Sequence, residues 1–220
     1  MGNLIGPSGY CDAYTFEPLN FNYHTISTRG SGIYKVKGSK HFGYAYHVKN
    51  ETDIETALGE VKQEHHSARH VAYAWRLGAD MDRYRANDDG EPSNSAGKPI
   101  LGQIEKYELT NVLIAVVRYF GGTKLGVGGL IDAYRTAAEM AIEDSTVIER
   151  QLMANFRLHF GYERMSEIML ALRTHDWQES NQDFKTSCSI DVALLPEKKE
   201  ELAHSFQAFS DIRIENLGIH

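Results

Sequence analysis

NVLIAVVRYFGGTKLGVGGLIDAYRTAAE, residues 111–139, is the stretch around which this chain is organised. Its first part, Val112 to Val117, is an unbroken apolar run rich in β-branched residues, which is typical of a strand covered on both faces. Five glycines then fall within nine residues, and a helix is predicted to begin near Leu130. That density of glycine costs backbone entropy, so it indicates positive φ angles or a close approach by another group.

The strand, the glycine-rich turn and the helix start form a candidate anion site, because free amide N–H groups and the helix dipole converge there. Arg118 and Lys124 are cations within reach. Two stricter phosphate motifs do not match: Leu125 follows Lys124 where Walker A requires Ser or Thr, and Ile131 occupies the third glycine position of GxGxxG. Asp132 also competes with an anion, so a tight turn that only packs helix on sheet is the alternative.

A second informative stretch, NDDGEPSNSAGKPIL, covers residues 87–101. Asp88, Asp89 and Glu91 lie within four residues, beside a glycine and a proline, which indicates an acidic turn. Ser95 is the expected N-cap of a helix that continues to about residue 108. Three carboxylates so close could bind a divalent cation, but their spacing is not that of an EF-hand loop. We therefore expect a solvated turn that caps a helix, and no metal.

DDGEPSNSAGKPIL followed by VVRYFGGTKLGVGGLIDAY resembles the IMPACT family, which comprises bacterial YigZ proteins and eukaryotic IMPACT proteins. HVAYAW, residues 70–75, fits the strand that precedes these motifs in the family. The resemblance is carried by motifs over residues 30–145 and by layout elsewhere. Family members often have Gly-Thr at Asn94 and Ser95 and Arg at Asp132, and the second change removes a positive charge beside the glycine-rich turn.

The resemblance implies an α+β protein of two domains. The first, residues 1–148 with a core of about 30–145, would be similar to the second domain of ribosomal protein S-five, with helices on one face of its sheet. The second, residues 149–220, would be similar to domain five of elongation factor G. Its pattern of elements reads βαββαβ, which is a ferredoxin-like layout.

Local patterns predict the remaining elements. Residues 33–37 and 42–48 form a predicted hairpin around a turn at Gly38-Ser39. Thr52 with Glu55 predicts a capping box and a helix to about His65. Strands are predicted at 70–77, 81–86, 151–160, 177–183, 186–194 and 212–217, and helices at 162–174 and from 196.

The two motifs give a candidate binding surface, and no catalytic residue is assigned. We expect the acidic turn, the glycine-rich turn and His70 to lie on one face of the first domain. His65, His66 and His70 have no nearby Cys and no HExxH motif, which favours hydrogen-bonded histidines over a metal site. The binding candidates are His70, Asp88, Asp89, Glu91, Arg118, Tyr119, Gly121, Gly122, Thr123, Lys124, Gly126, Gly128, Gly129 and Tyr134.

Composition limits the classes of partner. The net charge is −7 and the pI about 5.8, so binding of nucleic acid would need a local basic patch. Cys11 and Cys188 are too few for a disulfide framework and fit a reducing cytoplasm. Met1 to Tyr14 lacks the features of a signal peptide, and no apolar run is long enough for a membrane helix.

The resemblance implies a cytoplasmic binding protein linked to regulation of translation, with the ribosome, RNA or a translation-associated protein as partner and no cofactor. The kinase-pathway role of the eukaryotic members is not expected to transfer. Two alternatives remain open: an adaptor that binds only protein, and a small-molecule enzyme acting on a phosphorylated or nucleotide substrate at the face of the two turns. An open basic strip around Arg118 and Lys124 would favour a macromolecular partner, and a closed pocket an enzyme.

Overall fold

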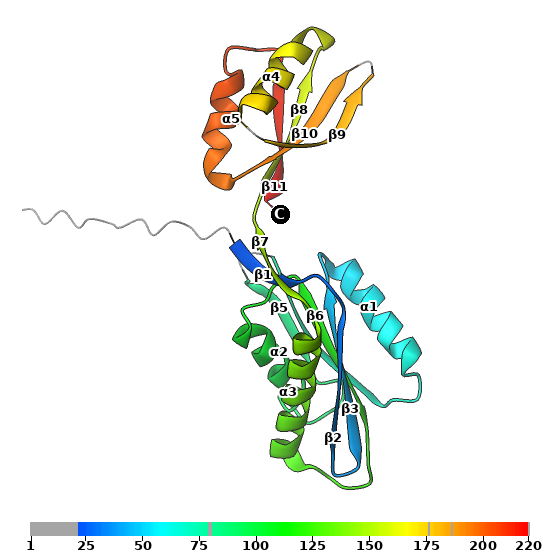
Figure 1. The fold of residues 1–220 in the computed structure, drawn as a ribbon. Coiled ribbons are helices and arrows are strands. Elements are labelled where there is room, and N and C mark those ends of the chain that lie inside the picture. Colours follow the sequence, from blue (N-terminus) through cyan, green and yellow to red (C-terminus); the bar gives the residue numbers. More distant parts are fainter. Residues whose placement is uncertain (1–21, 79–80, 176, 186, 220) are drawn as a thin grey trace, which may run out of the picture.

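The computed structural model describes residues 22–78, 81–175, 177–185 and 187–219, and these contain both helices and sheets (Figure 1). The expectations for Met1 to Tyr14, for Cys11 and for residues 79–80 lie outside the described residues. Three sheets are present, with strand orders β2-β3-β6-β4-β5, β11-β8-β10-β9 and β1-β7. No described helix combines the length and the hydropathy that a membrane span requires.

The five-stranded sheet is antiparallel and has β6 at its centre. The predicted strand at 112–117 is confirmed and extends by two residues, because Arg118 and Tyr119 still pair with β3. The strands are β2 (Gly30–Val36), β3 (Ser39–His47), β4 (His70–Leu77), β5 (Arg83–Asn87) and β6 (Val112–Tyr119). The hairpin of β2 and β3 turns at Lys37 and Gly38, whose φ angles of 46° and 76° are those of a type I′ turn.

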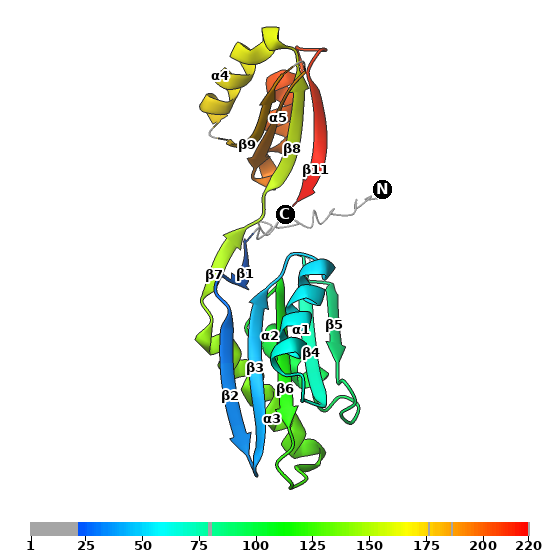
Figure 2. The same cartoon turned by 90° about the vertical axis from the view of Figure 1, so that its right-hand side faces the viewer.

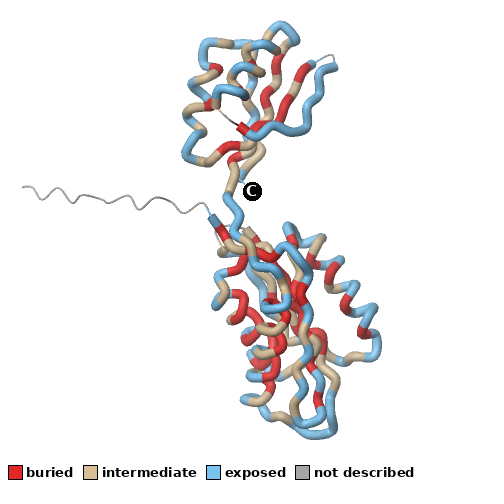
Figure 3. Tube along the Cα trace, in the orientation of Figure 1, coloured by how far each residue is buried: buried red, intermediate tan, exposed pale blue. Residues whose placement is uncertain are grey.

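Helices cover both faces of this sheet, so the expectation of helices on one face is wrong (Figure 2). One face packs against α1 (Glu51–Glu64), through residues such as Leu113 and Val117. The other packs against α2 (Gly97–Lys106) and α3 (Gly126–Asp144), through Val112, Ile114 and Val116. Both faces are covered because every residue from Val112 to Val117 is apolar. Successive side chains of a strand point to opposite faces of the sheet, so both faces need burial (Figure 3).

The helices begin at other residues than the sequence predicted. Asn50 caps α1 by accepting a hydrogen bond from the Asp53 N–H, and the Asp53 carboxylate accepts from the Lys49 N–H. This reciprocal cap leaves Thr52 inside the helix, so the predicted capping box was two residues late. The third helix, α3, begins at Gly126 rather than near Leu130, and three of the five glycines therefore lie in its first turn.

Close contact between α3 and the sheet depends on glycine. A Cβ atom at Gly43 would overlap the backbone oxygen of Ala137. A Cβ atom at Gly121 would overlap the backbone of Gly38, and the Gly121 N–H donates to Ser39 Oγ at 3.1 Å. The loop after β6 is therefore held against the tip of the β2–β3 hairpin, as the close-approach reading of these glycines requires.

The four-stranded sheet follows the predicted βαββαβ order. Its elements are β8 (Ala154–Phe160), α4 (Met165–His175), β9 (Gln178–Phe184), β10 (Cys188–Leu194), α5 (Lys199–Phe206) and β11 (Arg213–Ile219). Short 3₁₀ turns, η1 (Tyr162–Arg164) and η2 (Pro196–Lys198), precede the two helices. The core joins both helices to one face of the sheet, with Leu158, Ile168 and Ile190 fully buried.

The sequence reading missed the two-stranded sheet. β1 (Asn22–Ile26) pairs with β7 (Val147–Gln151), so the predicted strand at 151–160 is in fact the end of β7 and all of β8. Ile26 contributes to the core of α2 and α3. The division at residue 148 falls within β7 and stays a prediction. No single sheet runs through both halves of the described chain.

Candidate functional site

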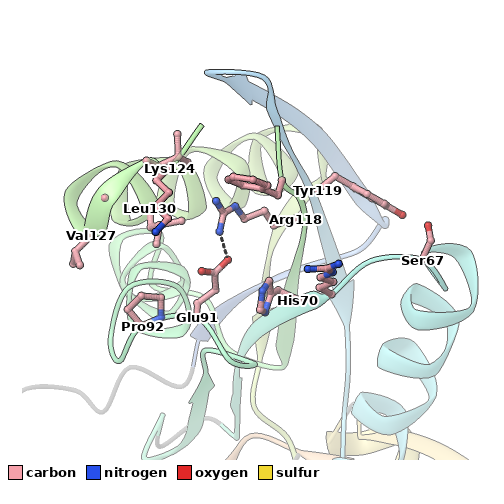
Figure 4. Close-up of a pocket in the computed structure, with 13 residues that line it drawn as sticks. Ser67, His70, Glu91, Pro92, Arg118, Tyr119, Lys124, Val127 and Leu130 are labelled. Carbon is pink, nitrogen blue, oxygen red and sulfur yellow. Dashed lines mark hydrogen bonds and ion pairs between the residues drawn. The ribbon is translucent and has the colours of Figure 1, made fainter. Parts of the chain in front are cut away.

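A pocket of 710 Å³ lies where β6 ends, and we call it the strand-end pocket (Figure 4). Four segments form it: the start of β4 with the residues before it, the acidic turn, the end of β6 and the start of α3. Because β4 runs antiparallel to β6, its first residue, His70, lies beside Arg118 near the end of β6. Predicted candidates from both motifs therefore meet in one place: His70, Glu91, Arg118, Tyr119, Lys124 and Gly126 all line this pocket.

A buried ion pair anchors the pocket. Arg118 Nη1 donates to Glu91 Oε1 at 2.7 Å, and the two side chains are only 10% and 4% exposed. The Tyr134 hydroxyl donates to the same Glu91 oxygen at 2.9 Å. Burial raises the pKa of Tyr134, with the Glu91 charge acting in the same direction, so the hydroxyl stays a donor. Glu91 therefore neutralises Arg118 and ties the acidic turn to β6 and α3.

Two histidines flank Arg118 on the same sheet face, because His41 and His70 are its register partners on β3 and β4. His41 is fully buried, and neither ring nitrogen has a hydrogen-bond partner among the described residues. Burial, followed by the charge of Arg118, lowers its pKa to about 4, so the ring is neutral near pH 7. His70 Nδ1 lies 2.7 Å from the Asp89 carbonyl oxygen and donates to it, because a carbonyl can only accept.

The acidic turn caps α2 and most of its residues are exposed, as expected of a solvated turn, and its aspartates are ordered by backbone hydrogen bonds. The Asp88 carboxylate accepts from the N–H groups of Asn94, Ala96 and Gly97, and so caps α2. The Asp89 carboxylate accepts from the Val71 N–H at 2.7 Å. These two carboxylates therefore hold the turn in place, and they keep their negative charges because the donors are neutral N–H groups.

Ser95 is not the N-cap that the sequence predicted. Its hydroxyl is buried and donates to the Pro92 carbonyl at 2.6 Å, which closes the turn. The Asp88 carboxylate instead accepts hydrogen bonds from the N–H groups of Ala96 and Gly97 at the helix start. Asp88 precedes these residues by eight and nine positions, which is farther than an N-cap residue lies from its N–H donors. Among the described residues no three His, Cys, Asp or Glu side chains are arranged to hold a metal ion.

The start of α3 opens into the pocket. No side chain caps this helix, its first turn carries no acidic residue, and Gly126 has a φ angle of 73°. Lys124 and Arg69 also line the pocket, are exposed, and form no ion pair within the described part of the chain. Asp132 lies beyond the first turn and pairs with Arg135 at 2.9 Å, so it opposes an anion less than predicted.

The other candidates support the pocket without lining it. Asp88, Asp89 and Tyr134 hold its walls, as described above. Gly121, Gly122 and Thr123 form the loop held by the hairpin, and Gly128 and Gly129 lie in the first turn of α3. The sequence reading missed the cation Arg69 and an apolar wall of Pro92, Phe120, Leu125, Val127 and Leu130. Pro92, Phe120 and Leu125 lie outside the helices and strands, and Val127 and Leu130 lie in the first turns of α3, so no common periodic pattern marks this wall in the sequence.

Two further hollows continue from the pocket around the strand ends, and we call them the hairpin groove. The first, of 380 Å³, shares Tyr119 and Phe120 with the strand-end pocket and is also lined by Lys40. The second, of 490 Å³, shares Phe42 and His65 with the first.

His65 holds the wall of this groove. Its Nε2 atom lies 2.6 Å from the Tyr44 hydroxyl, and its Nδ1 atom 3.1 Å from the Tyr119 hydroxyl. Burial lowers the pKa of His65, so the ring links the two tyrosines as a neutral group. The expectation of hydrogen-bonded histidines is therefore confirmed for His65.

Comparison with known proteins identifies relatives along most of the chain. Residues 37–142 match the family model of the Impact N-terminal domain. The chain is 31% identical to IMPACT family member YvyE of Bacillus subtilis over 184 residues, 84% of each protein, and 30% identical to IMPACT family member YigZ of Escherichia coli over 189 residues, 85% of this chain and 93% of YigZ. A crystal structure of a hypothetical protein, 27% identical, superposes with a TM-score of 0.70 and covers 90% of this chain and 98% of its own. This protein therefore belongs to the IMPACT family.

Proposed function

We propose that this protein is a cytoplasmic, translation-linked binding protein and that its partner is single-stranded RNA. The observation that carries the proposal is the continuity of the strand-end pocket with the hairpin groove, through shared walls of Tyr119 and Phe120 and then of Phe42 and His65. A groove of this kind, with aromatic walls and cations beside them, suits a chain that alternates flat bases and phosphates.

The strand-end pocket and the hairpin groove together form one continuous track, and the charges along it support binding of a polyanion. Arg69 and Lys124 at the pocket and Lys40 in the groove are exposed and form no ion pair among the described residues. Phe120 is 58% exposed and stands between the two, where a base can stack on it. Such stacking contributes about 1–3 kcal/mol per base. The net charge of −7 opposes a polyanion over the whole chain, but at the pocket Glu91 is paired with Arg118 and adds no unpaired negative charge.

The architecture supports a role in translation by analogy only. The strand order β11-β8-β10-β9, with both helices packed on one face, favours the ferredoxin-like description of residues 149–220 and the likeness to domain five of elongation factor G. The five-stranded sheet would correspond to the second domain of ribosomal protein S-five. Both analogues contact RNA or ribosomal protein, and a fold by itself does not determine function.

Charge reversal along the track tests the proposal. Lys40→Glu, Lys124→Glu and Arg69→Glu together should weaken binding of a fluorescent single-stranded RNA by tenfold or more and reduce its salt slope by about two. Lys98→Glu, Arg173→Glu and Lys198→Glu reverse the same number and kinds of charge at exposed positions outside the track. This control protein should bind as the wild type does. Equal binding by the two triple variants would refute the track.

Arg118 is unsuitable for this test. Arg118→Glu would place a second carboxylate against the buried Glu91. Two buried like charges at this distance disfavour the folded state, so lost binding would report unfolding.

The small-molecule alternative keeps one supporting observation. The strand-end pocket has the volume of a ligand site and brings His70, Arg118 and Lys124 together around apolar walls. Release of inorganic phosphate from nucleotides or phosphorylated RNA, measured over long incubations, tests this alternative. Turnover that is lost in Lys124→Gln would favour an enzyme over a binding protein.

A further inference from the structure

We infer that the strand-end pocket binds the terminal phosphomonoester of an RNA end, with the attached nucleoside against its apolar wall. This inference rests on the proposed RNA binding and adds a preference for ends. It follows from a difference within the track: the pocket differs from the hairpin groove in volume, in lining and in the balance of charge.

The pocket has room for a nucleotide. Its volume of 710 Å³ lies within the range of about 300–1,000 Å³ that is usual for small-ligand sites, whereas the adjoining hollow has 380 Å³. Leu125, Val127 and Leu130 line it from the start of α3, and Pro92 faces them from the acidic turn (Figure 4). These side chains give an apolar surface for a base and ribose, with Phe120 at the exit toward the groove.

Unpaired positive charge is concentrated at this end of the track. Lys124 and Arg69 both line the pocket without an ion pair in the described chain. At the far end of the hairpin groove, Arg29 is already paired with Glu64 at 3.3 Å. Phosphate is therefore favoured most strongly in the strand-end pocket.

Unsatisfied donors at the pocket match a phosphomonoester better than an internal phosphodiester. Arg118 lines the pocket, is nine-tenths buried, and its Nε–H has no hydrogen-bond partner among the described residues. The uncapped first turn of α3 adds free backbone N–H groups. A monoester has three free oxygens and a charge of about −1.5 to −2 at pH 7, whereas a diester has two free oxygens and a single charge.

RNAs of one sequence with different ends provide the test. One carries a 5′-phosphate, one a 3′-phosphate, and one hydroxyl groups at both ends, and their affinities are measured with the full-length protein. One phosphorylated RNA should bind about tenfold more tightly than the hydroxyl RNA, as expected for one added charge-assisted hydrogen bond. The arm that shows the gain identifies which end enters the pocket.

A carboxylate placed in the first turn of α3 serves as a competitor for the helix start. Gly128 is exposed at the third position of α3, and an added Cβ there would meet no atom within 4 Å. In Gly128→Glu the side chain can reach back to the helix start, as in a capping box, and should abolish the gain from the terminal phosphate. Gly128→Gln has the same shape without the charge and should retain the gain.

The outcomes separate this inference from the proposed function. If all three RNAs bind equally to the wild type, the end preference is refuted although RNA binding stands. A gain that persists in Gly128→Glu would place the phosphate elsewhere. If no RNA binds, adenosine monophosphate and adenosine are compared directly: phosphate-dependent binding that is lost only in Gly128→Glu supports the pocket while the RNA track fails, and no binding refutes both.

Discussion

The two larger sheets of this protein handle charge differently. The four-stranded sheet has helices on one face and polar side chains on the other, where Arg157 pairs with Asp191 and His159 with Glu215. The five-stranded sheet is covered on both faces, and the charged groups of the strand-end pocket lie where β6 ends and β4 begins. There Arg118 and Glu91 pair in the interior, and Lys124 and Arg69 remain without an ion pair among the described residues.

This contrast indicates where binding is expected. Paired charges on an open sheet face satisfy one another, so they leave little net field for a partner. Unpaired cations beside a pocket produce such a field, even in a chain whose net charge is −7. We therefore expect the partner to bind at the five-stranded sheet, because unpaired cations lie beside its pocket, whatever the net charge of the whole chain.

Replacing the arginine of each sheet by methionine should give the largest difference. Arg118→Met leaves Glu91 buried without its cation and should lower the free energy of unfolding by about 3–5 kcal/mol. Arg157 is 38% exposed, so Arg157→Met should cost clearly less. The chain has two Trp residues, Trp75 in β4 and Trp177 before β9. When one is replaced by Phe, the fluorescence of the other follows the unfolding of its own sheet in denaturant. Equal losses would contradict the contrast.

Acid should destabilise the five-stranded sheet and the four-stranded sheet, each with its helices, over different pH ranges. His41 has a folded pKa of about 4 against an ordinary value of 6.5, so the unfolded chain binds its proton first. Its neutral burial therefore costs stability as the pH falls from about 6.5 to 4, by about 3 kcal/mol in all. Arg157 holds the pKa of Asp191 below its usual 3.8, so that stabilising contribution is lost only below that pH.

Unfolding measured at a series of pH values, with each Trp as reporter, checks this difference. His41→Phe should remove most of the pH dependence of the Trp75 transition between pH 6.5 and 4. A remainder is expected from His47 and His65, whose pKa values burial also lowers. An unchanged slope in His41→Phe would show that this ring is not the group that titrates.

The smallest effect concerns the contact between helix and sheet. Gly43→Ala would push α3 from β3 at Ala137 and should cost about 1–3 kcal/mol. The matched control is Gly59→Ala in α1, where the added Cβ meets no atom within 4 Å, and it should stabilise by up to about 1 kcal/mol. Thermal unfolding resolves the opposite signs. If Gly43→Ala stabilised the protein as Gly59→Ala does, the close approach of α3 to β3 would not be needed for stability.

Much of the fold could be predicted from local patterns. The apolar run of β6, the alternation of the hairpin and the order of elements after residue 150 each depend on neighbours in sequence. Errors arose where partners are distant. β1 pairs with β7 more than 120 residues away, as in Asn22 with Gln151, and no local signal announces such a short strand.

The sequence by itself determined the family, the central strand and the membership of the two motifs in one site region. Ordered motifs and strand periodicity are local properties, and they survive without knowledge of the packing. Only the tertiary structure decided what each charge does. Glu91 joins Arg118 and Tyr134 across 27 and 43 residues, Asp88 caps α2 from outside it, and Arg69 comes to the pocket from the loop before β4. These roles depend on strand register and on burial, which residue spacing alone does not specify.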